Sequence, residues 1–321
     1  MFENIPKIEK PEFYIDLAIR TAKKIANNKK IHEKIKARRI VESEKLKVCC
    51  FSESIKANIA NIASAFPSMD QLPVFYKELL DTIIGADKLK IALSRISGLC
   101  AAIDKLAQNF QNKVRNTNQV DDVLEAKREM YGRTSSILKK NKDAFAFIEE
   151  SRKALKSFPS IKTKIPSVCI CGFPNVGKST LLSRLTGSRP EIAAYAFTTK
   201  QLMIGNIGKS LQIIDTPGTF NDNIRKMNWL ERQSYLAIKH LSSTVVYVFD
   251  ATETSGFPME MQESLFMHLV KKFRAKKFII YMSKTDLEIK NKAEFLKKYS
   301  TYDLFEDPEK LKEFLLEKLS K

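Results

Sequence analysis

Apolar positions recur with two different periods along this chain. In residues 1–160 they fall three and four apart, a spacing that places them on one face of a helix. An example is the series Leu89, Ala92, Leu93, Ile96, Leu99, Cys100, Ile103 and Leu106. Asn and Pro residues interrupt the pattern near positions 27–28, 66–67, 73 and 116–118. We therefore predict four or five helices that pack as an all-α bundle.

From about residue 168 the pattern changes to short apolar runs alternating with helical stretches. The runs predict strands at 168–171, 202–207, 211–214, 244–249 and 277–282, and a last helix is predicted at 308–319. Such alternation is typical of an α/β fold with a mostly parallel sheet flanked by helices, which binds ligands at the carboxyl ends of its strands. We predict two domains, a helical bundle at 1–160 and an α/β domain at 161–321, joined near 158–166.

Charge adds a class of partner to this picture. Lys and Arg number 55 against 37 Asp and Glu, a net charge of +18. Both predicted domains share the excess, which favours polyanionic partners, nucleic acid first and anionic membrane second. The five cysteines form no disulfide framework, and no apolar run approaches a membrane-spanning length. We expect a soluble, cytoplasmic protein in a reducing compartment.

The first chemical motif lies between the first predicted strand and a helix-like run. It has the pattern G-x-x-x-x-G-K-S and comprises Gly172, Phe173, Pro174, Asn175, Val176, Gly177, Lys178 and Ser179, followed by Thr180. Strand, glycine-rich loop and helix in this order predict a phosphate loop, whose backbone N–H groups surround phosphate oxygens. We expect Lys178 to reach the β- and γ-phosphates and the Ser179 hydroxyl to ligate Mg²⁺.

Two further motifs follow in the order that a nucleotide switch requires. Asp215 ends an apolar strand 37 residues after Lys178, in the sequence Asp-Thr-Pro-Gly, and is expected to hold Mg²⁺ through water. The N–H of Gly218 is expected to sense the γ-phosphate. Between the motifs lie Thr198 and Thr199, of which we favour Thr199 as the residue that closes over Mg²⁺; a solvated threonine-rich turn is the alternative.

The base-reading element is Ser283-Lys284-Thr285-Asp286, directly after the last long apolar run. A carboxylate at Asp286 can accept hydrogen bonds from N1–H and N2–H₂ of guanine, two donors that adenine does not offer. The usual first residue of such an element is Asn, whereas Ser283 has a shorter reach. The ordered set favours GTP and GDP.

Hydrolysis is expected to be slow. Thr219 follows Gly218 at the position where many switch GTPases carry a water-orienting Gln. Asn175 is a candidate for holding K⁺ beside the phosphates, where a cation stabilises developing negative charge. The alternative for Asn175 is a residue chosen for its turn conformation.

Residues 20–47 carry 11 basic and three acidic side chains. We predict that this basic segment contacts RNA phosphates, with Ile25, Ile31, Ile35 and Ile40 left to form an apolar face. A solvated basic face is the alternative.

The motif wording resembles a known family. Gly172–Ser179, Tyr195–Lys200 and Asp215–Gly218 resemble the Obg-related branch of translation-factor-type GTPases, and Phe66–Asp70, Pro73–Tyr76 and Ala126–Arg133 resemble the nucleolar GTP-binding protein family in its compact, archaeal-like form. This resemblance covers nearly the whole chain. It implies a P-loop GTPase, acting as a monomer with other assembly factors, that assists large ribosomal subunit assembly and packs its helical domain on ribosomal RNA.

Two rival functions remain. One is a GTPase that modifies or delivers another RNA, although no nucleophilic Cys/His pair or metal cluster is recognisable. The other is a regulatory GTPase that engages an anionic membrane through the basic helices, for which we find no lipidation signal or interleaved aromatic residues.

Overall fold

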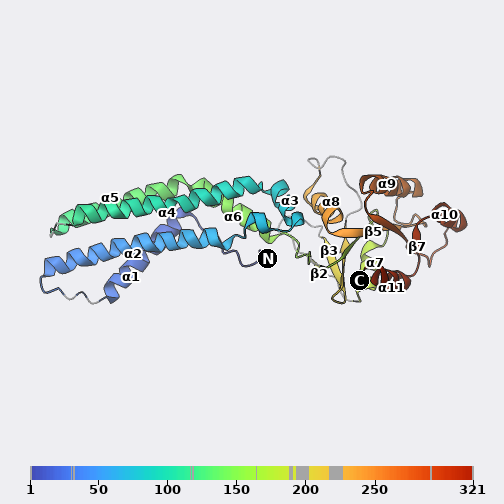
Figure 1. Cartoon of the computed structure of the whole chain (residues 1–321), viewed down its shortest axis with the longest axis horizontal. Coiled ribbons are helices and arrows are strands. Elements are labelled where there is room, and N and C mark those ends of the chain that lie inside the picture. The colour runs from blue at the N-terminus through green and yellow to red at the C-terminus, as the bar shows by residue number, and fades with distance from the viewer. Residues whose placement is uncertain are drawn as a thin grey trace. The chain divides into compact units, whose positions relative to one another are not determined.

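The computed structural model confirms the predicted fold class, helices followed by an α/β domain with a mostly parallel sheet (Figure 1). It describes residues 2–29, 31, 33–115, 117, 119–163, 165–187, 191–192, 202–216, 227–289 and 291–319, with backbone alone at 191–192 and 229–230. The chain divides into two compact units, Met1–Gln71 with Ile84–Lys156 and Leu72–Ile83 with Ser157–Lys321. The predicted boundary near residue 160 therefore omits one segment, Leu72–Ile83, that joins the second unit.

The first unit, the helical unit, is built from five long helices and one short 3₁₀ turn. Its elements are α1 (Pro11–Asn28), α2 (Lys36–Ala65), η1 (Met69–Gln71), α4 (Ala86–Val114), α5 (Val120–Lys140) and α6 (Lys142–Lys156). Pro11 occupies the first turn of α1, where its missing N–H costs no hydrogen bond. The N-terminal segment also contributes to the core, because Ile5 and Ile8 are buried and the Ile8 N–H donates to Glu149 Oε2 at 2.9 Å.

The core of the helical unit follows the predicted spacing. Leu89, Ile96 and Ile103 of α4 are fully buried, and α4 contacts α2, α5 and α6. Phe51 of α2 stacks on Tyr131 of α5 with ring centroids 4.0 Å apart. The helical period in the sequence thus marks the side chains that this unit buries.

The predicted apolar face of the basic segment is wrong. Ile25, Ile35 and Ile40 are exposed at 43%, 52% and 36%. Helix α1 packs on α2, and the side chains that α1 buries include Ala18 and Ala22. The basic segment therefore presents isoleucines and basic side chains together on its surface.

The second unit, the GTPase-type unit, contains a seven-stranded sheet in the order β2-β3-β4-β1-β5-β6-β7. The strands are β1 (Ser167–Cys171), β2 (Glu191–Ile192), β3 (Met203–Ile207), β4 (Leu211–Asp215), β5 (Ser242–Phe249), β6 (Lys277–Met282) and β7 (Asp303–Phe305). The pairs among β4, β1, β5, β6 and β7 are parallel, while β2 and β3 pair antiparallel. Because parallel strands end at one edge, the sheet gathers the motif-bearing loops there.

Helices cover both faces of this sheet (Figure 1). They are α7 (Lys178–Thr186), α8 (Trp229–His240), α9 (Met259–Lys272), α10 (Lys292–Lys298) and α11 (Pro308–Leu319). A further helix of this unit, α3 (Val74–Ile83), packs on α8. One face packs Val246 and Val248 of β5 in a core with leucines of α7 and α11. On the other face, Tyr247 and Phe249 of β5 contact Phe266 of α9. The alternation along β5 is the period of two that a strand buried on both faces requires.

Helix α3 is bound to the GTPase-type unit by several polar contacts. Glu78 accepts hydrogen bonds from Lys239 Nζ at 2.8 and 3.0 Å, and its carboxylate lies 3.0 Å from His240 Nε2. Arg232 of α8 donates to the carbonyl of Thr82 at 3.2 Å. Leu79 and Leu80 are fully buried. Helix α3 is therefore a structural part of this unit, although the chain enters and leaves it from the helical unit.

Candidate nucleotide-binding site

The predicted phosphate loop connects the carboxyl end of β1 to the N-terminus of α7. Gly172 has φ 146°, and a Cβ placed there would lie 2.6 Å from the carbonyl oxygen of Val248, so no other residue fits. Asn175 and Gly177 also have positive φ, at 62° and 96°. Successive turns of this kind direct backbone N–H groups to one side, which is the geometry of an anion-binding nest.

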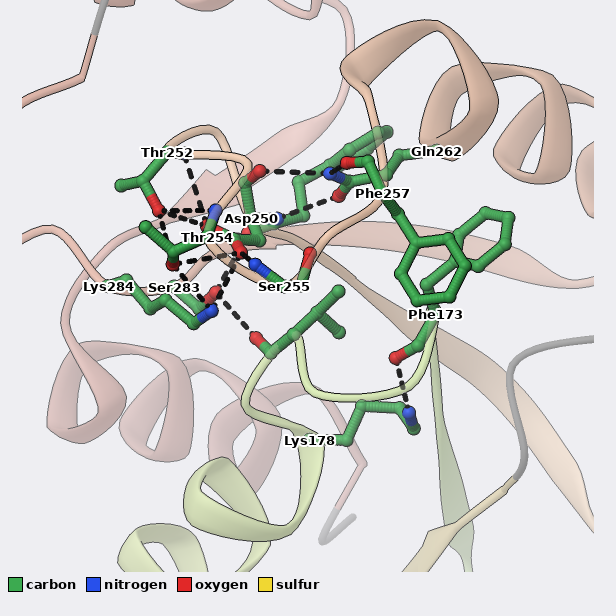
Figure 2. A network of polar contacts seen from close by, with 12 residues as sticks. Phe173, Lys178, Asp250, Thr252, Thr254, Ser255, Phe257, Gln262, Ser283 and Lys284 are labelled. Carbon is green, nitrogen blue, oxygen red and sulfur yellow. Dashed lines mark hydrogen bonds and ion pairs between the residues drawn. The ribbon is translucent and has the colours of Figure 1, made fainter.

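Lys178 begins α7 and lies over this loop. Its Nζ donates to the carbonyl of Phe173 at 2.7 Å (Figure 2). Burial lowers the pKa of Lys178, and the negative charge of Asp215 acts against that shift. The Phe173 ring stacks on Phe257 with centroids 4.4 Å apart. A partly buried ammonium beside inward N–H groups is suited to a phosphate chain.

Two predicted metal ligands meet directly. Ser179 Oγ donates to Asp215 Oδ2 at 2.8 Å, while Asp215 Oδ1 is buried and has no hydrogen-bond partner among the described residues. Burial raises the pKa of Asp215, and the Lys178 charge and the Ser179 hydrogen bond oppose this. An orphaned carboxylate oxygen next to a hydroxyl fits Mg²⁺, which takes oxygen ligands and needs a charge-bearing partner. These residues are thus suited to Mg²⁺.

Several predicted site residues lie outside the described residues. They are Thr198 and Thr199 of the segment before β3, and Gly218 and Thr219 of the segment after β4. Their roles at Mg²⁺ and the γ-phosphate stay predictions.

At the base-reading element the structure separates Ser283 from Asp286. Ser283 is buried, and its hydroxyl lies 2.6 Å from the carbonyl of Val176 and 3.0 Å from that of Phe249. It therefore connects this element to the phosphate loop. Asp286 is exposed in a turn closed by the Leu287 N–H on the Lys284 carbonyl at 3.1 Å. The role of Asp286 in reading the base stays a prediction.

Sequence reasoning missed Asp250. It follows β5 directly, whereas Asp215 is the last residue of β4, and the Asp250 side chain is fully buried. Lys284 Nζ lies 2.7 Å from Asp250 Oδ2 and 2.8 Å from Thr254 Oγ1. The available signal was an acidic residue at the end of a buried parallel strand, which is where ligands bind in such sheets.

The turn Tyr299–Thr301 precedes β7. Tyr299 is buried, and its hydroxyl donates to Glu263 Oε1 at 3.0 Å. Because β7 runs parallel to β6, the loop at the edge that carries the motifs is the one after β7. That loop holds Glu306 and Asp307.

No helix of the described chain is long and apolar enough to cross a membrane. Residues 2–162 match the model of the NOG1 N-terminal helical domain, and residues 167–284 match that of the 50S ribosome-binding GTPases. The two matches meet close to the transition between bundle and sheet.

Relatives match both halves of the chain. An uncharacterized protein of Methanocaldococcus jannaschii is 32% identical over 89% of this chain and 81% of its own length. Nucleolar GTP-binding protein 1 of Eremothecium gossypii is 31% identical over 89% of this chain. This chain spans only 45% of that protein.

A solved structure of a putative nucleolar GTP-binding protein 1 from Plasmodium falciparum covers 46% of this chain and 77% of its own, with 23% identity and a TM-score of 0.36. That likeness adds nothing to the assignment, which rests on the family matches and the long alignments. With a NOG1-type helical domain ahead of a P-loop GTPase domain, the chain belongs to the nucleolar GTP-binding protein family.

Proposed function

We propose that this protein binds GTP and GDP with Mg²⁺, hydrolyses GTP slowly, and acts in assembly of the large ribosomal subunit through contacts of its helical unit with ribosomal RNA. The observation that carries the nucleotide part is the Ser179–Asp215 contact of 2.8 Å beside Lys178. It brings two motifs that lie 36 residues apart to one point of the sheet edge.

Binding divides between the phosphate and base ends of the nucleotide. The loop from Gly172 to Thr180 takes the phosphates through its N–H groups and Lys178, and Ser179 and Asp215, joined by Thr199, hold Mg²⁺. When bound, Mg²⁺ neutralises charge on the β- and γ-phosphates. Lys284 and Asp286 meet the base, and Ser283 joins their turn to the phosphate loop. The Gly218 N–H senses the γ-phosphate.

Hydrolysis depends on groups other than a glutamine. Thr219 has no amide to orient water, so turnover is slow without added positive charge. Asn175 is exposed and lies in the phosphate loop with its backbone in the left-handed region. Its side-chain oxygen can help hold K⁺ beside the phosphates, where a cation stabilises the transition state.

The ribosomal role rests on the relatives' printed names and on charge. One matching family is named for GTPases that bind the 50S ribosome, and relatives are named nucleolar GTP-binding proteins. On the helical unit, Lys34, Lys36, Arg38 and Arg39 are exposed, and the salt bridges within the described residues leave all four unpaired. We place the protein in the cytoplasm, as a monomer that works with other assembly factors.

A specific observation supports an alternative surface. The exposed Ile25, Ile35 and Ile40 stand among these basic residues, and isoleucines beside cations also suit an anionic membrane interface. The two roles differ in what the basic residues contact: RNA phosphates or lipid headgroups.

Sedimentation of tagged protein with ribosomal particles tests the proposal. We expect cosedimentation with large-subunit precursors that changes between GDP and a non-hydrolysable GTP analogue. A Lys178→Ala variant is the control, since it should lose the nucleotide dependence. Cosedimentation with anionic vesicles and not with ribosomal particles would support the alternative.

A further inference from the structure

The base-reading element is held from two sides in this structure, and Asp250 provides one of them. Its carboxylate is fully buried at the carboxyl end of β5. Oδ1 accepts from the N–H of Thr252 at 3.1 Å and from its hydroxyl at 2.5 Å. Oδ2 accepts from the Ser255 N–H at 2.8 Å and lies 2.7 Å from Lys284 Nζ (Figure 2). Lys284 is therefore the cation that matches this buried charge.

The position of Asp250 is itself rigidly determined. Its backbone N–H donates to Gln262 Oε1 at 2.8 Å, and its carbonyl accepts from Gln262 Nε2 at 2.9 Å. Gln262 is fully buried and also donates to Phe257 at 2.9 Å. Gln262 thus holds Asp250 in place independently of Lys284. A supporting group that is fixed in this way can orient a residue that meets a ligand.

Lys284 needs such support because its backbone is strained. It has φ 54°, a conformation that a non-glycine residue rarely adopts. Such a residue persists when its surroundings hold it. Its ion pair to Asp250 and its hydrogen bond to Thr254 secure the side chain, and its carbonyl closes the turn to Leu287. That turn carries Asp286.

Burial works to raise the pKa of Asp250, but hydrogen bonds from Lys284 and Thr252 outweigh it, so the pKa lies below its usual value. Asp250 therefore remains a carboxylate and keeps its attraction for Lys284 at neutral pH. The three residues of the element have separate tasks. Ser283 faces the phosphate loop, Lys284 faces Asp250, and Asp286 is left exposed.

We propose that Asp250 is a positioning residue for base selectivity: by holding Lys284 it orients the turn that presents Asp286 to guanine. This rests on the proposed guanine-nucleotide function. The buried Asp250 carboxylate is engaged by Thr252, Ser255 and Lys284, so its effect passes through Lys284 to the base and not to the phosphates. A role confined to core stability would affect all nucleotides equally.

The test is a double-mutant cycle with Asp250→Asn and Lys284→Met, read by competition of GTP, XTP and ATP for the site. Asp250→Asn keeps the shape of the side chain and removes its charge. We expect each single variant to weaken GTP by about 10- to 100-fold, the range for a lost charge-assisted hydrogen bond, while ATP changes by less than about threefold. We expect the double variant to bind GTP with the same affinity as the single variant that binds it less tightly, because the two residues act as one unit.

Asp303→Asn is the matched control. It breaks the Lys277–Asp303 ion pair, which is also 2.7 Å long. This pair lies at the amino ends of β6 and β7, away from the base-reading turn, so the ratio of GTP affinity to ATP affinity should stay unchanged. Equal weakening of all three nucleotides, or additive effects in the cycle, would overturn the positioning role while leaving guanine binding intact. A wild-type protein without preference for GTP over ATP would overturn the proposed function, and this inference with it.

Discussion

Ser283 and Asp286 stand three residues apart, yet their surroundings are opposite. The Ser283 hydroxyl lies within hydrogen-bond distance of two backbone carbonyls, so it acts inside the protein. The Asp286 side chain is exposed to solvent. At the residue scale, we therefore propose that base selectivity depends on Asp286, while Ser283 connects the turn to the phosphate loop.

Asp286→Ala is expected to remove most of the preference for guanine. Two charge-assisted hydrogen bonds, each of about 1.5–3 kcal/mol, disappear together. Affinity for ATP should stay nearly constant because the phosphate loop is unchanged. Competition titrations with GTP, XTP and ATP measure this, and Asp286→Asn is a useful companion because its amide can donate to the extra carbonyl of xanthine. An unaltered guanine preference in the Ala variant would exclude Asp286 as the base-reading residue.

Asn175→Ala is expected to abolish stimulation of hydrolysis by K⁺ with little change in GTP affinity. The side-chain oxygen is lost, while the backbone N–H groups that contact phosphate remain. Phosphate release measured in K⁺ and in Na⁺ tests this. Asn175→Gly is the control for conformation, since glycine adopts the positive φ of 62° more easily; it should lose the K⁺ effect as well. Equal wild-type rates in both salts would remove the cation proposal.

At the element scale, α3 is the unexpected feature. Its residues lie between helices of the helical unit in sequence, but it packs on α8 of the GTPase-type unit. The Tyr76 hydroxyl receives the Ile161 N–H at 2.9 Å and donates to the Pro159 carbonyl at 2.7 Å. Burial raises the pKa of Glu78, but Lys239 and His240 hold it below its usual value overall. The stability that Lys239 and His240 contribute through Glu78 is present above the unfolded pKa of Glu78. It is lost as the pH falls through the folded pKa.

Leu79→Ala in α3 should destabilise the GTPase-type unit by about 2–5 kcal/mol, the cost of truncating a fully buried leucine. We expect hydrogen exchange to show lost protection in α8 and β5 and unchanged protection in α2 and α4. The matched control is Leu138→Ala in α5, also fully buried, which should give the reverse pattern. Lost protection confined to α2 and α4 in the Leu79 variant would show that α3 belongs with the helical unit.

At the scale of the whole molecule, the basic segment and the phosphate loop lie in different units. The exposed basic residues Lys34, Lys36, Arg38 and Arg39 belong to the helical unit, and the phosphate loop belongs to the other. Substitutions in one unit should therefore leave the intrinsic chemistry of the other unaltered.

Replacing Lys34, Lys36, Arg38 and Arg39 by Gln should weaken binding to ribosomal particles. Each lost phosphate contact should reduce the slope of log affinity against log salt by about one unit, because fewer counterions are released. GTP affinity should change by less than about 0.5 kcal/mol, as is usual for surface substitutions. Filter binding across a salt series measures the first effect and titration with GTP the second.

The control for this variant makes the same charge change elsewhere on the helical unit, at the exposed Lys139, Lys140, Lys142 and Lys153. It should retain the wild-type slope. Salt-sensitive binding to anionic vesicles alone would indicate a membrane surface. If the first variant keeps wild-type affinity and slope for both targets, the basic segment is only a solvated face.

The sequence by itself determined the order of elements and the phosphate loop. Helical spacing and short apolar runs report local burial, so α11 was predicted at its observed bounds, 308–319, and five of the seven strands were predicted within two residues. The phosphate loop is contiguous, and its chemistry follows from the glycines and from Lys178 alone. Such features need no knowledge of distant residues.

Only the tertiary structure decided which distant groups meet. Asp250 and Lys284 lie 34 residues apart and Ser283 and Val176 lie 107 apart, and nothing local in the sequence joins them. Likewise, the exposure of Ile25, Ile35 and Ile40 and the unit to which α3 belongs depend on which surface each helix buries. The physical reason is that the burial and ion pairing of a side chain depend on the segment packed against it. That segment is determined only when the sheet and the helices pack together.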